Sequence, residues 1–191
     1  MNNVEENKDK FLKAEFFMLA WSAATQQRVE GFTLWSNNCT PKDKSNLKKD
    51  IRNKIEQLIQ NDYCKNSKIN QNKHVENIKK VQNYFIEYEN KTKCFAENSY
   101  IYNFSTAQKL LNTLLKYWWC IGWLNGNEPP AFPVDRINIK NLNDETCNLL
   151  NWTDDKDGEI YQKVISTAEQ QLNTEKYKNI AQWELDNWKR R

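Results

Sequence analysis

The amino-acid sequence predicts an all-α protein. Only four glycines and four prolines occur among the 191 residues, and few stretches alternate β-branched with polar side chains. Apolar residues instead recur three or four positions apart through most of the chain. The length suits a single domain, residues 1–191, built from six or seven helices. Such helices could pack as two lobes with a cleft between them.

Three amphipathic helices are expected in the N-terminal half, over residues 5–24, 45–60 and 73–90. In the first, Phe11 and Leu19 belong to the expected apolar stripe. The second begins at Ser45, a residue type that caps helices. His74, the only histidine, lies at the start of the third, where we expect a surface or capping side chain.

The best-defined helix is expected over residues 105–123. Ser105 and Gln108 match the S-x-x-Q capping box, which predicts a helix start at this point. The leucines that follow, together with Trp118 and Trp119, make the helix apolar over more than half of its circumference. A helix of this kind lies in the middle of a bundle, and we expect both tryptophans in the core.

A proline-rich connector follows the central helix. Residues 129–136, PPAFPVDR, hold three of the four prolines, and proline fixes φ and forbids helix. The connector should be stiff and extended, so it either bridges two helices or holds Asp135 in a fixed place. Beyond it, a short helix is expected near residues 144–150. Two longer ones should follow, over residues 157–172 and 174–189, with Thr174 as the cap of the last.

The composition limits the classes of protein to consider. A net charge of +3 does not require a nucleic-acid partner, although the six cations between Lys42 and Lys54 could seat phosphates. The five widely spaced cysteines predict free thiols in a reducing cytosol, and with one histidine no metal or other cofactor is expected. The polar N-terminus is unlike a signal peptide. No run reaches the roughly 20 apolar residues of a spanning helix, so we expect a cytoplasmic protein without a membrane partner.

Most catalytic motifs are missing from the sequence. It contains no P-loop, no G-x-G-x-x-G and no G-x-S-x-G, and one histidine gives little support to triad chemistry. Lys109 and Asp135 remain as candidates. Lys109 lies near the start of the central helix, where the macrodipole disfavours a positive charge and apolar neighbours can exclude water. A lysine in this setting is a candidate nucleophile that forms a Schiff base with an aldehyde carbon.

Asp135 can approach Lys109 only if the connector folds back along the central helix, which is roughly 26 Å long at 1.5 Å per residue. A structural interpretation stays open for both residues. Lys109 could be exposed to water, and Asp135 could cap a helix or pair with Arg136.

Three segments carry a family resemblance. They are KHVENIKKVQNYFIE (73–87), FSTAQKLLNTLL (104–115) and PAFPVDRINI (130–139). In this order they resemble parts of the helix-hairpin-helix DNA glycosylases, the superfamily of endonuclease III and the archaeal 8-oxoguanine glycosylases. The parts are the helix before the hairpin, the hairpin with its lysine-bearing helix, and the proline-valine-aspartate segment. The resemblance implies a helical fold of two lobes with a DNA-binding cleft.

The resemblance also implies roles for individual residues. Lys109 would attack the sugar C1′ of a flipped nucleotide, and Asp135 would orient it and stabilise the oxocarbenium-like charge. FSTAQK lacks the glycines of the family's hairpin, so the N–H groups at the helix start would hold the DNA phosphate. Residues around the pair would bind the substrate: Ser105, Gln108, Trp123, Phe132 and Arg136.

Two functions are therefore expected. The first is a DNA base-excision glycosylase that works without metal and could also act as an abasic-site lyase. The second is a helical protein without catalysis that holds a protein or nucleic-acid partner on its aromatic-rich surface. They differ in one geometric requirement, because the glycosylase needs Lys109 and Asp135 to converge in one cleft.

Overall fold

Eight α-helices and no β-strand occur in the described part of the chain, which confirms the predicted all-α class. The computed structural model describes residues 3–26, 33–65, 69–97 and 99–188. The helices are α1 (Asn3–Thr25), α2 (Pro41–Leu58), α3 (Gln71–Thr92), α4 (Phe104–Cys120), α5 (Arg136–Asn141), α6 (Glu145–Asn148), α7 (Glu159–Gln171) and α8 (Ile180–Asn187).

The number of helices exceeds the expected six or seven because the segment after the connector, where the sequence predicts one short helix, forms two. Each helix directly follows an aspartate, Asp135 for α5 and Asp144 for α6. The aspartate side chain caps the helix by accepting hydrogen bonding from backbone N–H in its first turn. The last helix is shorter than the expected 174–189, whose residue 189 lies outside the described residues.

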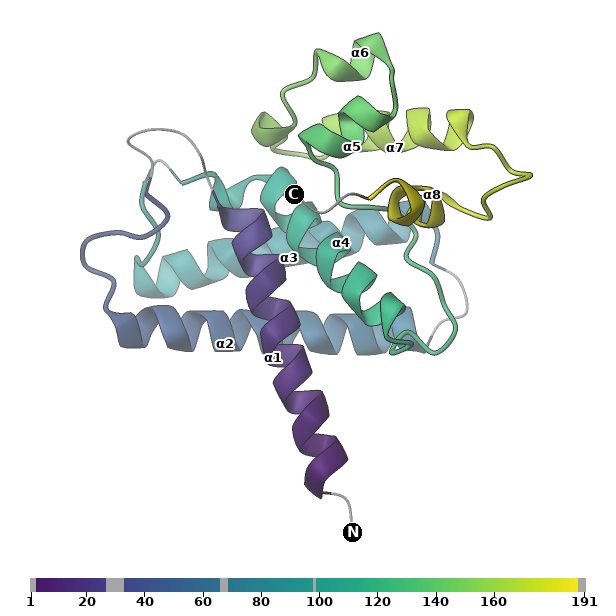
Figure 1. Ribbon diagram of the computed structural model, residues 1–191. Coiled ribbons are helices and arrows are strands. Elements are labelled where there is room, and N and C mark those ends of the chain that lie inside the picture. Colours follow the sequence, from purple (N-terminus) through teal and green to yellow (C-terminus); the bar gives the residue numbers. More distant parts are fainter. Residues whose placement is uncertain (1–2, 27–32, 66–68, 98, 189–191) are drawn as a thin grey trace.

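Helix α4 is the central element, as predicted, and α1 and α3 pack against it from different sides. Helix α2 packs against α3, so α1 to α4 form one group (Figure 1). Helices α5 to α8 form a second group beside the N-terminal half of α4 (Figure 1). The connector from α4 returns along the molecule to reach them, which brings Asp135 back toward the start of α4.

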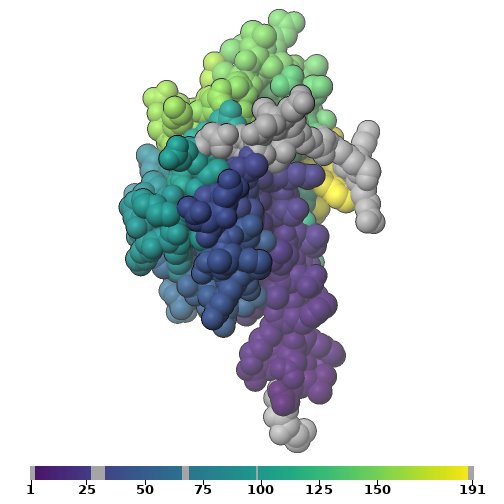
Figure 2. All heavy atoms as spheres, turned by 90° about the vertical axis from the view of Figure 1, so that its left-hand side faces the viewer, coloured from purple at the N-terminus to yellow at the C-terminus, as the bar shows by residue number. Residues whose placement is uncertain are grey.

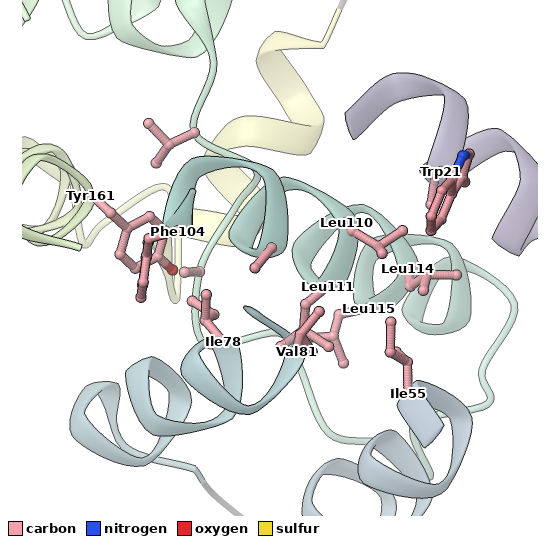
Figure 3. Close-up of a cluster of buried hydrophobic side chains, with 14 of the residues drawn as sticks. Trp21, Ile55, Ile78, Val81, Phe104, Leu110, Leu111, Leu114, Leu115 and Tyr161 are labelled. Atoms are coloured by element: carbon pink, nitrogen blue, oxygen red, sulfur yellow. The ribbon is translucent and has the colours of Figure 1, made fainter. Parts of the chain in front are cut away.

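The core fills the space between these helices. Figure 3 shows the leucines of α4 facing Ile78 and Val81 of α3 and Ile55 of α2, with Trp21 of α1 beside them. All of these side chains are buried, as is Trp118, whereas Trp119 is half-buried. Burial of apolar surface at about 25 cal/mol per Å² is the main force that holds α4 in the centre.

Helix α1 is less buried than its sequence suggested. Its N-terminal half extends beyond the other helices (Figures 1 and 2). The expected stripe is wrong for Phe11 and Leu19, which are exposed, and α1 instead buries Phe17 and Trp21. The contact face therefore lies along a different stripe of the helix, where Trp35 stacks on Trp21 and Phe85 meets the Trp21 ring edge-on.

Two of the expected helix caps are replaced by nearby residues, and a third is not formed. Thr40 caps α2 in a capping box with Asp43, in place of Ser45. Asn179 caps α8 in place of Thr174. Helix α4 begins one residue before Ser105, and neither Ser105 nor Gln108 forms the capping box, because both side chains bond to distant backbone groups.

Two of the five cysteines form a disulfide, so the prediction of five free thiols is wrong. Cys39, just before α2, is joined to Cys94, just after α3. This bond removes the basis for expecting a reducing cytosol, since stable disulfides form in oxidising surroundings. Cys64, Cys120 and Cys147 are free.

Reducing the disulfide is expected to lower stability. The bond joins residues 55 positions apart, and closing a loop of that length removes about 4 kcal/mol of chain entropy from the unfolded state. Urea unfolding with and without dithiothreitol measures the difference. The Cys39→Ser/Cys94→Ser variant should match the reduced protein and show no response to reductant. A parent protein that unfolds at the same urea concentration in both conditions would contradict the expectation.

His74 is buried, so the prediction of a surface or capping side chain is wrong. Its Nε2 lies 2.9 Å from Asn112 Oδ1, and its Nδ1 lies 2.7 Å from the Tyr63 hydroxyl. The Asn112 oxygen can only accept, so Nε2 carries the proton and Nδ1 accepts from Tyr63. Burial lowers the pKa of His74 to about 4, although the Asn112 bond opposes the shift.

The buried histidine is expected to make stability depend on pH. Its pKa is about 4 in the folded chain and 6.5 without burial, so the unfolded chain binds the proton more tightly. Its contribution is complete above pH 6.5 and is lost as the pH falls toward 4, about 2 kcal/mol between about pH 7 and pH 5. Urea unfolding at both pH values measures this loss. The His74→Gln variant should lose clearly less, and an equal loss in both proteins would contradict the expectation.

None of the helices in the described ranges is long and apolar enough to cross a lipid bilayer. The same residues contain no cluster of three histidine, cysteine or acidic side chains that could hold a metal ion.

Candidate active site

The structure brings Lys109 and Asp135 together. Lys109 Nζ lies 3.4 Å from Asp135 Oδ2, and the two side chains are 17% and 22% exposed. Lys109 extends from the second turn of α4, whereas Asp135 ends the connector and caps α5. The pair is therefore formed between the two groups of helices, and each residue keeps access to solvent.

Gln108 fixes the connector next to Asp135. Its side-chain Nε2 donates to the carbonyl of Val134 over 2.7 Å, and its Oε1 accepts from the Val134 N–H over 3.0 Å. Both groups are buried, so these bonds hold the backbone in one register against α4. Because Gln108 and Lys109 are neighbours, the same turn of α4 holds Asp135 and presents the amine to it.

Asp135 uses its two oxygens differently. Oδ1 accepts from the backbone N–H groups of Ile137 and Asn138, at 2.9 and 3.2 Å, and so caps α5. Oδ2 faces Lys109. The carboxylate that caps α5 is therefore also the partner of the amine.

A tryptophan also lies next to the amine. Lys109 Nζ lies 5.0 Å from the centroid of the Trp152 ring, within reach of a cation–π interaction. The 3₁₀ turn Trp152–Asp154 is held in place by the start of α4, because Ser105 Oγ and Asn103 Nδ2 both donate to the carbonyl of Thr153 over 3.0 Å. The first turns of α4 thus position both neighbours of Lys109.

Lys109 and Asp135 line a groove of about 440 Å³ between the two groups of helices. The end of α1, one face of α4, the start of α5 and α8 with Trp188 form its walls. A second ion pair lies in this groove, Lys116 with Glu184, at 2.7 and 2.9 Å. Lys116 is two turns along α4 from Lys109, and its amine lies 5.5 Å from the centroid of the Trp188 ring.

The other predicted substrate-binding residues do not line this groove. Ser105 and Gln108 are buried and bonded to backbone carbonyls, so their roles here are structural. Phe132 is buried against Trp183, because the connector packs its aromatic side chain inward. Trp123 packs against Trp118 beyond the C-terminal end of α4, far along the helix from Lys109. Arg136 is exposed and lines a second groove.

The sequence-based search missed the side chains that complete the site. Lys116 and Glu184 were not singled out, although seven residues separate Lys109 from Lys116 and place them on the same face of a helix. Trp152 had no signal in the sequence, since its contact with Lys109 depends on how the chain folds after α6.

The Gln108→Leu variant is expected to lose stability and to misplace Asp135. Leucine leaves the N–H and C=O of Val134 buried without partners, at a cost of about 2–6 kcal/mol for the two groups. Urea unfolding measures the loss, and Gln170→Leu on the exposed face of α7 is the matched control. Equal unfolding midpoints for the two variants would show that the bonds between Gln108 and Val134 contribute little to stability.

Searches for related proteins gave no match: no family model fits the chain, and neither a curated protein nor a solved structure resembles it significantly.

Proposed function

We propose that the protein is a DNA base-excision glycosylase that uses Lys109 as its nucleophile and Asp135 as its charged partner, and that it could also act as an abasic-site lyase. The observation that supports this proposal is the 3.4 Å approach of Lys109 Nζ to Asp135 Oδ2 in the wall of an open groove. The two residues are 26 positions apart and meet only because the connector folds back.

The pair has the groups that base removal requires. The Lys109 ammonium gives a proton to the departing base, and the electron pair of the bond between C1′ and the base leaves with that base. The negative charge of Asp135 stabilises the oxocarbenium-like sugar, as fixed charges do at developing charges. The freed lone pair of Lys109 then forms a bond to C1′.

A Schiff base follows from this adduct. The bond between C1′ and the ring oxygen O4′ breaks, its electron pair stays on O4′, and one proton moves from nitrogen to O4′. The product is an iminium between Lys109 and C1′. Water hydrolyses it, or loss of a C2′ proton leads to strand cleavage in a lyase. Borohydride adds hydride to the iminium carbon and makes the bond permanent.

The groove offers suitable surroundings for a flipped nucleotide. Its volume of about 440 Å³ lies within the range of about 300–1,000 Å³ that is common for small-ligand pockets. Trp188 supplies an aromatic surface for stacking, and Lys116 and Glu184 supply a donor and an acceptor beside it.

Base release and borohydride trapping test the proposal. The intact protein is incubated with duplex oligonucleotides that carry a panel of damaged bases or an abasic site, with and without borohydride. We expect base release from one member of the panel and a covalent protein–DNA adduct that forms only with borohydride. No base release and no adduct across the whole panel would contradict the proposal.

A non-catalytic binding protein is the second candidate. It is favoured by the fact that the Asp135 cap and the ion pair with Lys109 also serve the structure by themselves. In that case the protein would bind a nucleic acid or a protein in the groove and release no base. The cytoplasmic location expected from the sequence stays a prediction.

A further inference from the structure

A second, smaller groove adjoins the one that holds Lys109 and Asp135. It has a volume of about 290 Å³ and is lined by Arg136, Ile139, Lys140, Asn148, Leu150 and Trp152. Arg136 follows Asp135 directly in the chain, and the Trp152 ring that borders this groove also contacts Lys109. The start of α5 and Trp152 therefore separate the two grooves.

The charge in the two grooves differs. In the larger one, Lys109 and Lys116 each have a carboxylate partner. In the smaller one, no lining residue is acidic, and Arg136 and Lys140 form no ion pair with the described residues. The two cations are exposed and lie one turn apart on α5. The smaller groove thus presents two positive charges without compensation, in a concave surface.

We propose that the smaller groove binds the DNA phosphate next to the nucleotide whose sugar lies at Lys109. This inference rests on the proposed glycosylase function. Because Arg136 directly follows Asp135 and Trp152 borders both sites, a phosphate next to a nucleotide held at the Lys109 amine can reach this groove. Arg136 offers two parallel N–H donors to that phosphate, and Lys140 adds a point charge.

Trp152 gives the two grooves a common element. The centroid of its ring lies 5.0 Å from Lys109 Nζ, and the same ring lines the smaller groove. An aromatic plane in this position can pack against the deoxyribose or the neighbouring base, contacts that tolerate any sequence. The smaller groove would therefore orient the DNA strand for the reaction without recognising its base sequence.

The salt dependence of DNA binding tests the assignment. The probe is a fluorescent duplex with a tetrahydrofuran abasic analogue, which binds but does not react with an amine. Arg136→Gln/Lys140→Gln should reduce the slope of log affinity against log salt by about 0.9, because the two cations hold one phosphate and each lost phosphate contact contributes about 0.9. The matched control, Lys79→Gln/Lys163→Gln, removes two exposed cations from α3 and α7 and should leave the slope unchanged.

A double variant that keeps both charges separates the effect of lost charge from the effect of impaired folding. Arg136→Lys/Lys140→Arg keeps both positive charges and should restore most of the slope, and thermal unfolding should show all variants to be folded. An unchanged slope in the glutamine variant, or an equal fall in the control, would overturn the assignment. The assignment would also be overturned if the same concentration of inorganic phosphate displaced the duplex from the parent and from the glutamine variant.

The outcomes for this groove and for the glycosylase can be distinguished. If trapping occurs and the slope does not depend on Arg136 and Lys140, the glycosylase stands and the phosphate assignment falls. If the slope falls as expected and the parent releases no base, the groove binds DNA in a protein without the proposed activity.

Discussion

The Lys109→Gln variant is expected to release no base and to form no adduct with borohydride. Glutamine is similar in length, but its amide has no basic lone pair, so neither the proton transfer nor the bond to C1′ can occur. Loss of a nucleophile lowers turnover by roughly 10³-fold or more in enzymes that use covalent catalysis. Single-turnover base release, followed by gel electrophoresis, measures the effect.

Lys116→Gln is the matched control for this change. It lies on the same face of α4, lines the same groove and has its own carboxylate partner. We expect Lys116→Gln to bind the substrate more weakly, because a donor to the nucleotide is lost, and still to form the trapped adduct, because the attacking amine is present. If Lys109→Gln trapped DNA as well as the parent, the amine of Lys109 would not be the nucleophile.

Asp135→Asn is expected to abolish base release while hardly changing thermal unfolding. Asparagine caps helices about as well as aspartate, so its oxygen can still accept from Ile137 and Asn138. It carries no charge, so the carboxylate next to Lys109 is lost. Removal of one electrostatic contact to the transition state costs about 10²–10³-fold in rate. Single-turnover base release and a thermal melt measure the two effects.

Asp135→Ala completes the comparison. Alanine removes both the charge and the cap, so the rate should fall as in Asp135→Asn and the stability should fall by about 1 kcal/mol. The difference in stability between the two variants then reports the cap alone. A large loss of stability in Asp135→Asn would instead mean that the Asp135 carboxylate mainly holds the structure together.

The sequence was sufficient to predict the elements that depend on neighbouring residues. The apolar stripe of α4 and its central place follow from spacing along one helix, and three prolines within eight residues restrict the connector that carries Asp135. The meeting of Lys109 and Asp135 could be stated as a hypothesis because both lie at the ends of such elements.

Contacts between distant parts of the chain could not be predicted in the same way. Gln108 matched a local capping box, yet its side chain pairs with Val134, 26 residues away. Lys116 meets Glu184 across 68 residues. The spacing of five cysteines does not indicate which two will meet. His74 is buried because Tyr63 and Asn112 satisfy its two nitrogens, and neither is near it in sequence.

Mass-spectrometric mapping of the reduced adduct is the most direct test of the site. Trypsin does not cleave after a modified lysine, so an adduct on Lys109 leaves residues 94–116 as one peptide, whereas an adduct on Lys116 leaves residues 110–136. We expect the sugar remnant on the 94–116 peptide, and its loss in Lys109→Gln. An adduct on another lysine or on the terminal amine would contradict the role of the Lys109–Asp135 pair.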